Sequence, residues 1–72
     1  MTQGERIIAT LKADGGWVES ERFYAQYIRN PATRVSELRA KGEPIAVRHT
    51  PRRDTEGRVL YTGSDFKWEG TR

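Results

Sequence analysis

The sequence contains no cysteine and only one histidine among its 72 residues. Disulfides, iron–sulfur clusters and thiolate zinc sites are therefore excluded, and no transition-metal site is expected. No apolar run approaches the length of a membrane span, and the N-terminal letters MTQGERII lack the apolar core of a signal peptide. We therefore expect a cytoplasmic protein in a reducing compartment, without membrane contact.

Apolar residues are also few, at 35% of the chain, whereas charged residues make up 32%. A chain of this length forms one domain, and so small a domain buries only about 60% of the surface of its unfolded chain. The aromatic residues, at 10% of the chain, bring large contact areas and are expected to supply much of the core.

Residues that could form a catalytic centre are missing as well. His49 has no cysteine and no evident carboxylate partner in the sequence, and Glu19 and Glu21 are explained by helix capping. There is no glycine-rich phosphate loop of the required form, and a chain this small lacks a cleft for most substrates. We therefore expect a protein that is not an enzyme and holds no cofactor.

Positive charge, by contrast, is concentrated in the middle of the chain. From Arg29 to Arg58 there are eight cations and four anions, whereas from Met1 to Ile28 there are three cations and four anions. From Val59 onward the charges cancel. This basic segment indicates an acidic partner.

The first two helices are predicted over residues 3–14 and 21–28. A capping box opens the first helix, and Gly15 ends it. Ser20 is a favoured N-cap for the second, which follows a short strand or plug at Trp17 and Val18. Apolar residues at helical spacing are expected to face the core, namely Ile7, Ile8 and Leu11 on the first helix and Phe23, Tyr24, Tyr27 and Ile28 on the second.

A third helix is predicted over residues 31–41. Asn30 is a favoured N-cap and Pro31 a favoured first helical residue, while Gly42 stops the helix. Pro31 also requires the second helix to have ended before it, which leaves a turn of about three residues.

A two-stranded hairpin follows the third helix. Ile45 and Val47 are expected on one strand with Val59 and Tyr61 opposite, around a loop of residues 50–57. We place the end of the domain at residue 63, so that residues 1–63 form the domain and residues 64–72 a C-terminal tail. Phe66 and Trp68 in this tail either fold back onto the core or remain exposed for a partner.

This order of elements predicts an α+β fold, a winged helix-turn-helix with three helices and a C-terminal β-hairpin wing. The stretches GERIIATLKADGGWVES and ATRVSELRAKGEPI resemble the small winged helix-turn-helix proteins of bacteria and their phages. In those proteins a pattern R-[IV]-x-x-L-R-x-x-G-x-x-I ends the DNA-reading helix, and it is matched here by Arg34, Val35, Leu38, Arg39, Gly42 and Ile45. The resemblance covers roughly residues 4–62, and the turn YIRNP departs from the commoner pattern because it has no glycine.

The resemblance implies binding of duplex DNA in a bacterial or phage-infected cell, in transcriptional control or as an accessory factor in recombination. The third helix would enter the major groove, where arginine can donate twice to guanine, asparagine can pair with adenine, and glutamate can accept from cytosine. The wing would lie on the backbone or in the minor groove. The expected DNA-contacting residues are Arg29, Asn30, Thr33, Arg34, Ser36, Glu37 and Lys41 around the third helix, and Arg48, Arg52, Arg53 and Arg58 on the hairpin.

Two further expectations concern partners. One module covers half of a typical DNA site, so a homodimer or a cooperative array is expected, with Leu60, Phe66 and Trp68 as candidate contacts. The alternative function is a protein-interaction module that binds a polymerase or another protein through Phe66 and Trp68, because the fold does not fix the function. Binding of single strands through the aromatic residues is less favoured, since their spacing is that of a helix core.

Overall fold

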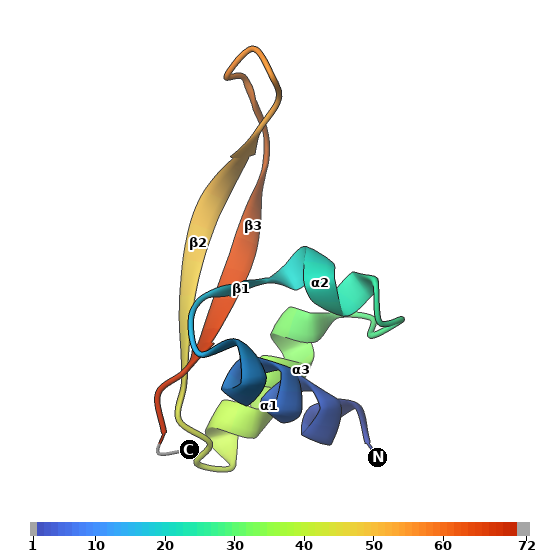
Figure 1. The fold of residues 1–72 in the computed structure, drawn as a ribbon, viewed down its shortest axis with the longest axis vertical. Coiled ribbons are helices and arrows are strands. Elements are labelled where there is room, and N and C mark those ends of the chain that lie inside the picture. Colours follow the sequence, from blue (N-terminus) through green and yellow to red (C-terminus); the bar gives the residue numbers. More distant parts are fainter. Residues whose placement is uncertain (1, 71–72) are drawn as a thin grey trace.

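The computed structural model describes residues 2–70, which form three helices and a three-stranded antiparallel sheet (Figure 1). In chain order the elements are α1 (Gln3–Asp14), β1 (Val18–Glu19), α2 (Ser20–Tyr24), α3 (Pro31–Ala40), β2 (Ile45–Arg53) and β3 (Val59–Trp68). The fold is therefore of the α+β class, as expected. The helices gather at one end, and the β2–β3 hairpin projects from them along the 38 Å long axis.

The first helix, α1, begins at the predicted capping box. The hydroxyl of Thr2 accepts a hydrogen bond from the backbone N–H of Glu5 at 3.1 Å, and the backbone N–H of Thr2 donates to the carboxylate of Glu5 at 3.4 Å. At the other end Gly15 adopts φ 77°, and its N–H donates to the carbonyl of Leu11. Both ends confirm the prediction of a helix over residues 3–14, because local side-chain and glycine chemistry sets them.

The core forms where one face of the sheet meets the helices. Val18, Phe66 and Val47 are neighbours across the sheet order β1–β3–β2. The ring of Phe66 lies 6.0 Å from the ring of Phe23, which α2 contributes. The buried apolar residues are Ile7, Leu11, Val18, Phe23, Ile28, Val35, Ile45 and Phe66.

The second helix, α2, is shorter than predicted. It ends at Tyr24 instead of residue 28, and Ser20 is its first residue, not its N-cap. The Ser20 hydroxyl donates to the carboxylate of Glu21 at 3.0 Å, so it does not cap the helix.

The predicted aromatic stripe on this helix is divided by the early stop. Phe23 and Ile28 are fully buried, whereas the side chains of Tyr24 and Tyr27 are exposed. Tyr27 adopts a left-handed φ of 62°, which turns the chain out of the helix. The 3.6-residue spacing therefore no longer decides which residues face the core after Tyr24.

The third helix, α3, runs from Pro31 to Ala40 and confirms the predicted helix to within one residue. Asn30 occupies the N-cap position, but its side chain makes no capping hydrogen bond. Its backbone is left-handed, with φ 51° and ψ 55°, instead of the extended conformation of an ordinary N-cap. The predicted capping role of its side chain is therefore wrong.

The β2–β3 hairpin is longer than predicted. β2 continues through Arg53 and β3 begins at Val59, so only residues 54–58 form the tip. The prediction of a loop over residues 50–57 is wrong, because Thr50, Pro51 and Arg52 pair with residues of β3.

The register of the hairpin also differs from the predicted one. Val47 lies opposite Phe66 and Ile45 opposite Trp68, whereas the prediction placed Val59 and Tyr61 there. The observed register puts Phe66 between Val47 of β2 and Val18 of β1, in the middle of the core. The predicted register would have left this large side chain without a strand on either side.

Residues 64–68 continue β3 and do not begin a tail. The boundary expected after residue 63 falls inside the strand. Phe66 is fully buried, which matches the first of the two alternatives for this segment, so it is not available to a partner. Trp68 is half-buried, and the Nζ of Lys12 lies 4.7 Å from the centre of its ring.

Candidate nucleic-acid interface

The outer face of α3 is open to solvent and carries small side chains. Pro31 and Val35 turn into the core, and Leu38 packs against it. On the opposite side Thr33 and Ser36 are exposed. A face with small hydroxyl-bearing residues allows close approach of base edges in a major groove.

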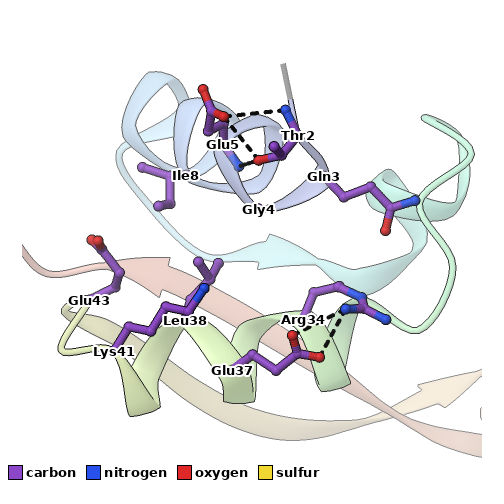
Figure 2. Close-up of a pocket in the computed structure, with 10 residues that line it drawn as sticks. All are labelled: Thr2, Gln3, Gly4, Glu5, Ile8, Arg34, Glu37, Leu38, Lys41 and Glu43. Carbon is purple, nitrogen blue, oxygen red and sulfur yellow. Dashed lines mark hydrogen bonds and ion pairs between the residues drawn. The ribbon is translucent and has the colours of Figure 1, made fainter.

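Arg34, Glu37 and Lys41 line the flank of α3 that faces α1 (Figure 2). This flank and the first two turns of α1 enclose a groove of about 450 Å³. Nη1 of Arg34 donates to both carboxylate oxygens of Glu37, at 2.9 and 3.1 Å. Glu5 and Glu43 also line the groove, so its charges are mixed and it is not a dedicated anion site.

Arg52 lies inside a hydrogen-bond network and is not the exposed loop residue that the sequence predicted. Its side chain is only 15% exposed. Nε and Nη2 donate to the two carboxylate oxygens of Glu21, at 2.7 and 3.0 Å, and Nη2 also donates to Asp65 at 2.9 Å. Nη1 donates to the hydroxyl of Thr50. Because β2 extends past residue 50, these donors point onto the sheet and are taken up within the chain.

Asp65 is the most buried charged residue of the network, at 2% exposure. Besides Arg52 it accepts hydrogen bonds from Nε of Arg48 at 3.0 Å and from the hydroxyl of Thr50 at 2.9 Å. Burial alone would raise the pKa of Asp65, but these hydrogen bonds outweigh it and lower the pKa. The ion pairs and hydrogen bonds therefore favour the ionised form of this buried carboxylate.

Glu21 and Tyr61 extend the network to α2 and to the outer half of β3. The hydroxyl of Tyr61 donates to the Glu21 carboxylate at 2.7 Å. The hydrogen bonds from Arg52, followed by that from Tyr61, lower the pKa of Glu21 to about 2. The same carboxylate raises the pKa of Arg52 and that of Tyr61 by favouring their protonated forms.

Arg48 is half-exposed and has two contacts on the solvent side of the sheet. Its guanidinium pairs with Asp65 and lies 4.3 Å from the centre of the Trp17 ring. Nζ of Lys67 lies 5.9 Å from the same ring. Arg48 thus has a structural role within the chain, because it covers Trp17 and Asp65.

The end of β2 and the hairpin tip carry two of the predicted contacts, Arg53 and Arg58, both exposed. Arg58 pairs with Asp54 at 3.0 Å and with Glu56 at 2.9 Å. The guanidinium of Arg53 donates to the carbonyl of Gly57 at 2.8 Å and makes no ion pair among the residues described. Hydrogen bonds from the backbone of Arg58, first, and of Glu56 lower the pKa of Asp54 and shape the turn.

The turn between α2 and α3 exposes two tyrosines that helical spacing predicts for the core. Arg29 and Asn30 are exposed as expected, and beside them Tyr24 and Tyr27 are 56% and 90% exposed. Both tyrosines were assigned to the core by their spacing. The absence of glycine from this turn was the available signal, because a non-glycine residue then has to take the left-handed position.

Arg39, which is not among the predicted contacts, is exposed on α3. Within residues 2–70, Arg29, Arg39, Lys41 and Arg53 make no ion pair. These four cations surround α3 or lie at the end of the hairpin, whereas the other described cations without an ion pair, Arg6, Lys12 and Lys67, lie on α1 and β3.

A metal site and a membrane span are the other possibilities for the described part of the chain. No group of three or more His, Cys, Asp or Glu residues could hold a metal ion there. His49 is exposed, and its Nδ1 lies 3.2 Å from the hydroxyl of Ser64. None of the described helices has the length and apolarity needed to cross a bilayer.

Comparison of the chain with protein-family models, with curated proteins and with solved structures found no match.

Proposed function

We propose that the chain is a winged helix-turn-helix protein that binds duplex DNA, with α3 in the major groove and the β2–β3 hairpin on the backbone or in the minor groove. The order helix, strand, helix, helix, hairpin, with β3 between β1 and β2, supports this proposal. A role as a small bacterial or phage regulator of transcription, or as a recombination accessory factor, is part of the same proposal.

The observation that carries the proposal is the open outer face of α3 beside cations without ion pairs. Thr33 and Ser36 offer hydroxyl groups to base edges, and Arg29, Arg39 and Lys41 are available to phosphates. These cations lie beside a helix face whose side chains are small enough to enter a groove, and they can neutralise phosphates on either side of it.

The contacts that we propose differ from those expected from the sequence in two respects. Arg52 is left out, because its donors are occupied by Glu21, Asp65 and Thr50. Arg34 shares its charge with Glu37, to which Nη1 alone donates, and an exposed pair of this kind contributes only about 0–1 kcal/mol. The phosphates therefore can compete with Glu37 for Arg34.

A pair of matched substitutions tests the proposed face. Ser36→Glu places a negative charge on the outer face of α3, and Ala9→Glu makes the same change in net charge on the exposed side of α1. Ser36→Glu should weaken binding of a fluorescent duplex at low salt by about tenfold or more, as expected for loss of a groove contact. Ala9→Glu should weaken binding of the same duplex by less than about twofold. Equal losses would show that α3 is not the contacting helix.

One observation favours a second candidate, a protein-interaction module. Val59, Leu60 and Tyr61 in the outer half of β3 are 53%, 63% and 52% exposed. Three adjacent exposed apolar residues on a strand can mark a protein contact, either with a second copy or with another protein. If the parent chain fails to bind duplex at low salt, and Leu60→Lys changes its concentration-dependent self-association, this second candidate replaces the first.

A further inference from the structure

Tyr27 occupies a backbone position that normally belongs to glycine. Its N–H donates to the carbonyl of Tyr24 at 2.9 Å, and the N–H of Ile28 donates to the carbonyl of Phe23 at 2.9 Å. This pair of bonds, with Tyr27 at φ 62°, is the Schellman arrangement at the end of a helix. The apolar contact that accompanies the motif is also in place, since Phe23 and Ile28 are both fully buried.

The side chain of Tyr27 makes no contact that would offset the strain of its backbone conformation. It is 90% exposed, and it makes no hydrogen bond or ring contact with residues 2–70. A residue with a Cβ is disfavoured in the left-handed region, whereas glycine is not. Stability alone would therefore favour glycine at position 27, and the tyrosine calls for a role outside the chain.

The surroundings of Tyr27 indicate the kind of partner. Tyr24 is half-exposed one turn before it, and Arg29 is exposed two residues after it. No aspartate or glutamate occurs between Glu21 and Glu37, a stretch that contains three arginines. In Figure 1 the segment between α2 and α3 projects from the body of the molecule, so it can meet a large partner. An exposed tyrosine pair in a stretch without negative charge suits a polyanion.

We propose that Tyr27, supported by Tyr24, is a DNA-contacting residue that packs on the sugar–phosphate backbone where α3 enters the groove. The inference rests on the proposed function and adds a contact to it. The hydroxyl of Tyr27 donates to a phosphate oxygen, the ring covers a deoxyribose, and Arg29 neutralises a neighbouring phosphate. Such contacts fix the register of the helix on the duplex without reading its sequence.

The test compares thermal stability and duplex affinity in two variants at position 27. Tyr27→Gly and Tyr27→Asn both suit the left-handed position, so the melting temperature should stay the same or rise by up to about 8 °C. Affinity for a short duplex at low salt, measured well below the melting temperature, should fall by about fivefold or more. Stability and binding therefore should change in opposite directions or independently.

A matched control separates loss of the ring from loosening of the turn. Ala25→Gly changes an exposed residue of the same turn that has φ −63°, where glycine brings no relief of strain. It should lower the melting temperature by a few degrees and change affinity by less than about twofold.

Three results would overturn the inference. Unchanged affinity in both position-27 variants would refute the contact and leave the proposed function standing if the parent binds duplex. A lower melting temperature in both variants would show that the ring is structural. Failure of the parent chain to bind any duplex at low salt would refute the proposed function and this inference with it.

Discussion

The guanidinium of Arg52 and the carboxylate of Asp65 lie 2.9 Å apart, with side chains that are only 15% and 3% exposed. The pair joins β2 to β3, and the second partner of Arg52, Glu21, lies on α2 at 2.7 Å. The residues of the outer half of β3, 59–62, are all exposed. Charged side chains therefore tie the projecting hairpin to the helices where no apolar core is available.

Removal of the central arginine should destabilise the protein strongly. Arg52→Ala leaves Asp65 and Glu21 with fewer donors, and breaking a buried ion pair on one side costs about 3 kcal/mol. Urea unfolding measures this loss. Arg53→Ala, which removes an exposed arginine next to it, should change the free energy of unfolding by less than about 0.5 kcal/mol. Similar losses in the two variants would contradict the structural role of Arg52.

The network also predicts a loss of stability in acid. The pKa of Glu21 is lowered from 4.5 to about 2, and that of Asp65 is lowered as well. Groups with a lowered folded-state pKa stabilise the protein above their unfolded pKa, and this contribution disappears as the pH falls through the folded value. The free energy of unfolding should therefore fall between about pH 5 and pH 2. Glu21→Gln should flatten this pH dependence, and an unchanged profile in that variant would contradict the account.

Gly63 should resist substitution because of the same arginine. A Cβ at position 63 would lie 2.7 Å from atoms of the Arg52 guanidinium. Since the guanidinium is held by carboxylates, Gly63→Ala should cost about 1–3 kcal/mol. In an Arg52→Ala background the same change should cost about 1 kcal/mol less, which a double-mutant cycle measures. Additive costs would mean that the two residues are not coupled.

The salt dependence of DNA binding should report the proposed phosphate contacts. With about five phosphates neutralised, the logarithm of the affinity should fall with the logarithm of salt with a slope of about −4. Arg29→Ala should make this slope shallower by about 1. Lys67→Ala, which removes a cation beside Trp17 that is not among the proposed contacts, should leave the slope unchanged. A parent slope near zero would contradict a phosphate-based interface.

The parts of the fold set by local chemistry could be predicted from the sequence. The capping box at Thr2 and Glu5 and the stop at Gly15 gave the correct first helix, and Pro31 marked the start of the third. These signals lie within a few residues of the end that they determine. The α+β class followed from them together with the alternation of apolar and polar residues near the C-terminus.

The hairpin register could not be predicted, because it depends on contacts far apart in the sequence. In the sequence, the alternation of apolar and polar residues at 59–61 makes that segment as good a strand partner for Val47 as the segment around Phe66. Only the position of Phe66 between Val18 and Val47 in the folded core decides between them. A strand pattern defines which residues share a face but does not define the partner strand.

The prediction of the candidate site was partly wrong for the same reason, because it too depends on contacts between residues far apart in the sequence. Arg52 counted as a loop cation because its partner Glu21 lies 31 residues away in the sequence. Tyr27 was predicted to be a core residue because the helical spacing was continued past the end of α2. No glycine marks that end in the sequence, and Tyr27 itself takes the left-handed position. In both cases the charge or the apolar character was read correctly, and the location was not.

The most direct test of the proposed interface is an NMR titration of the isotopically labelled chain with a short random-sequence duplex at two salt concentrations. We predict that the largest backbone amide shifts fall in residues 27–41 and 53–58 and become smaller at the higher salt concentration. Shifts confined to residues 59–62, or no shifts at the lower salt concentration, would contradict the proposal that α3 and the hairpin tip bind duplex DNA.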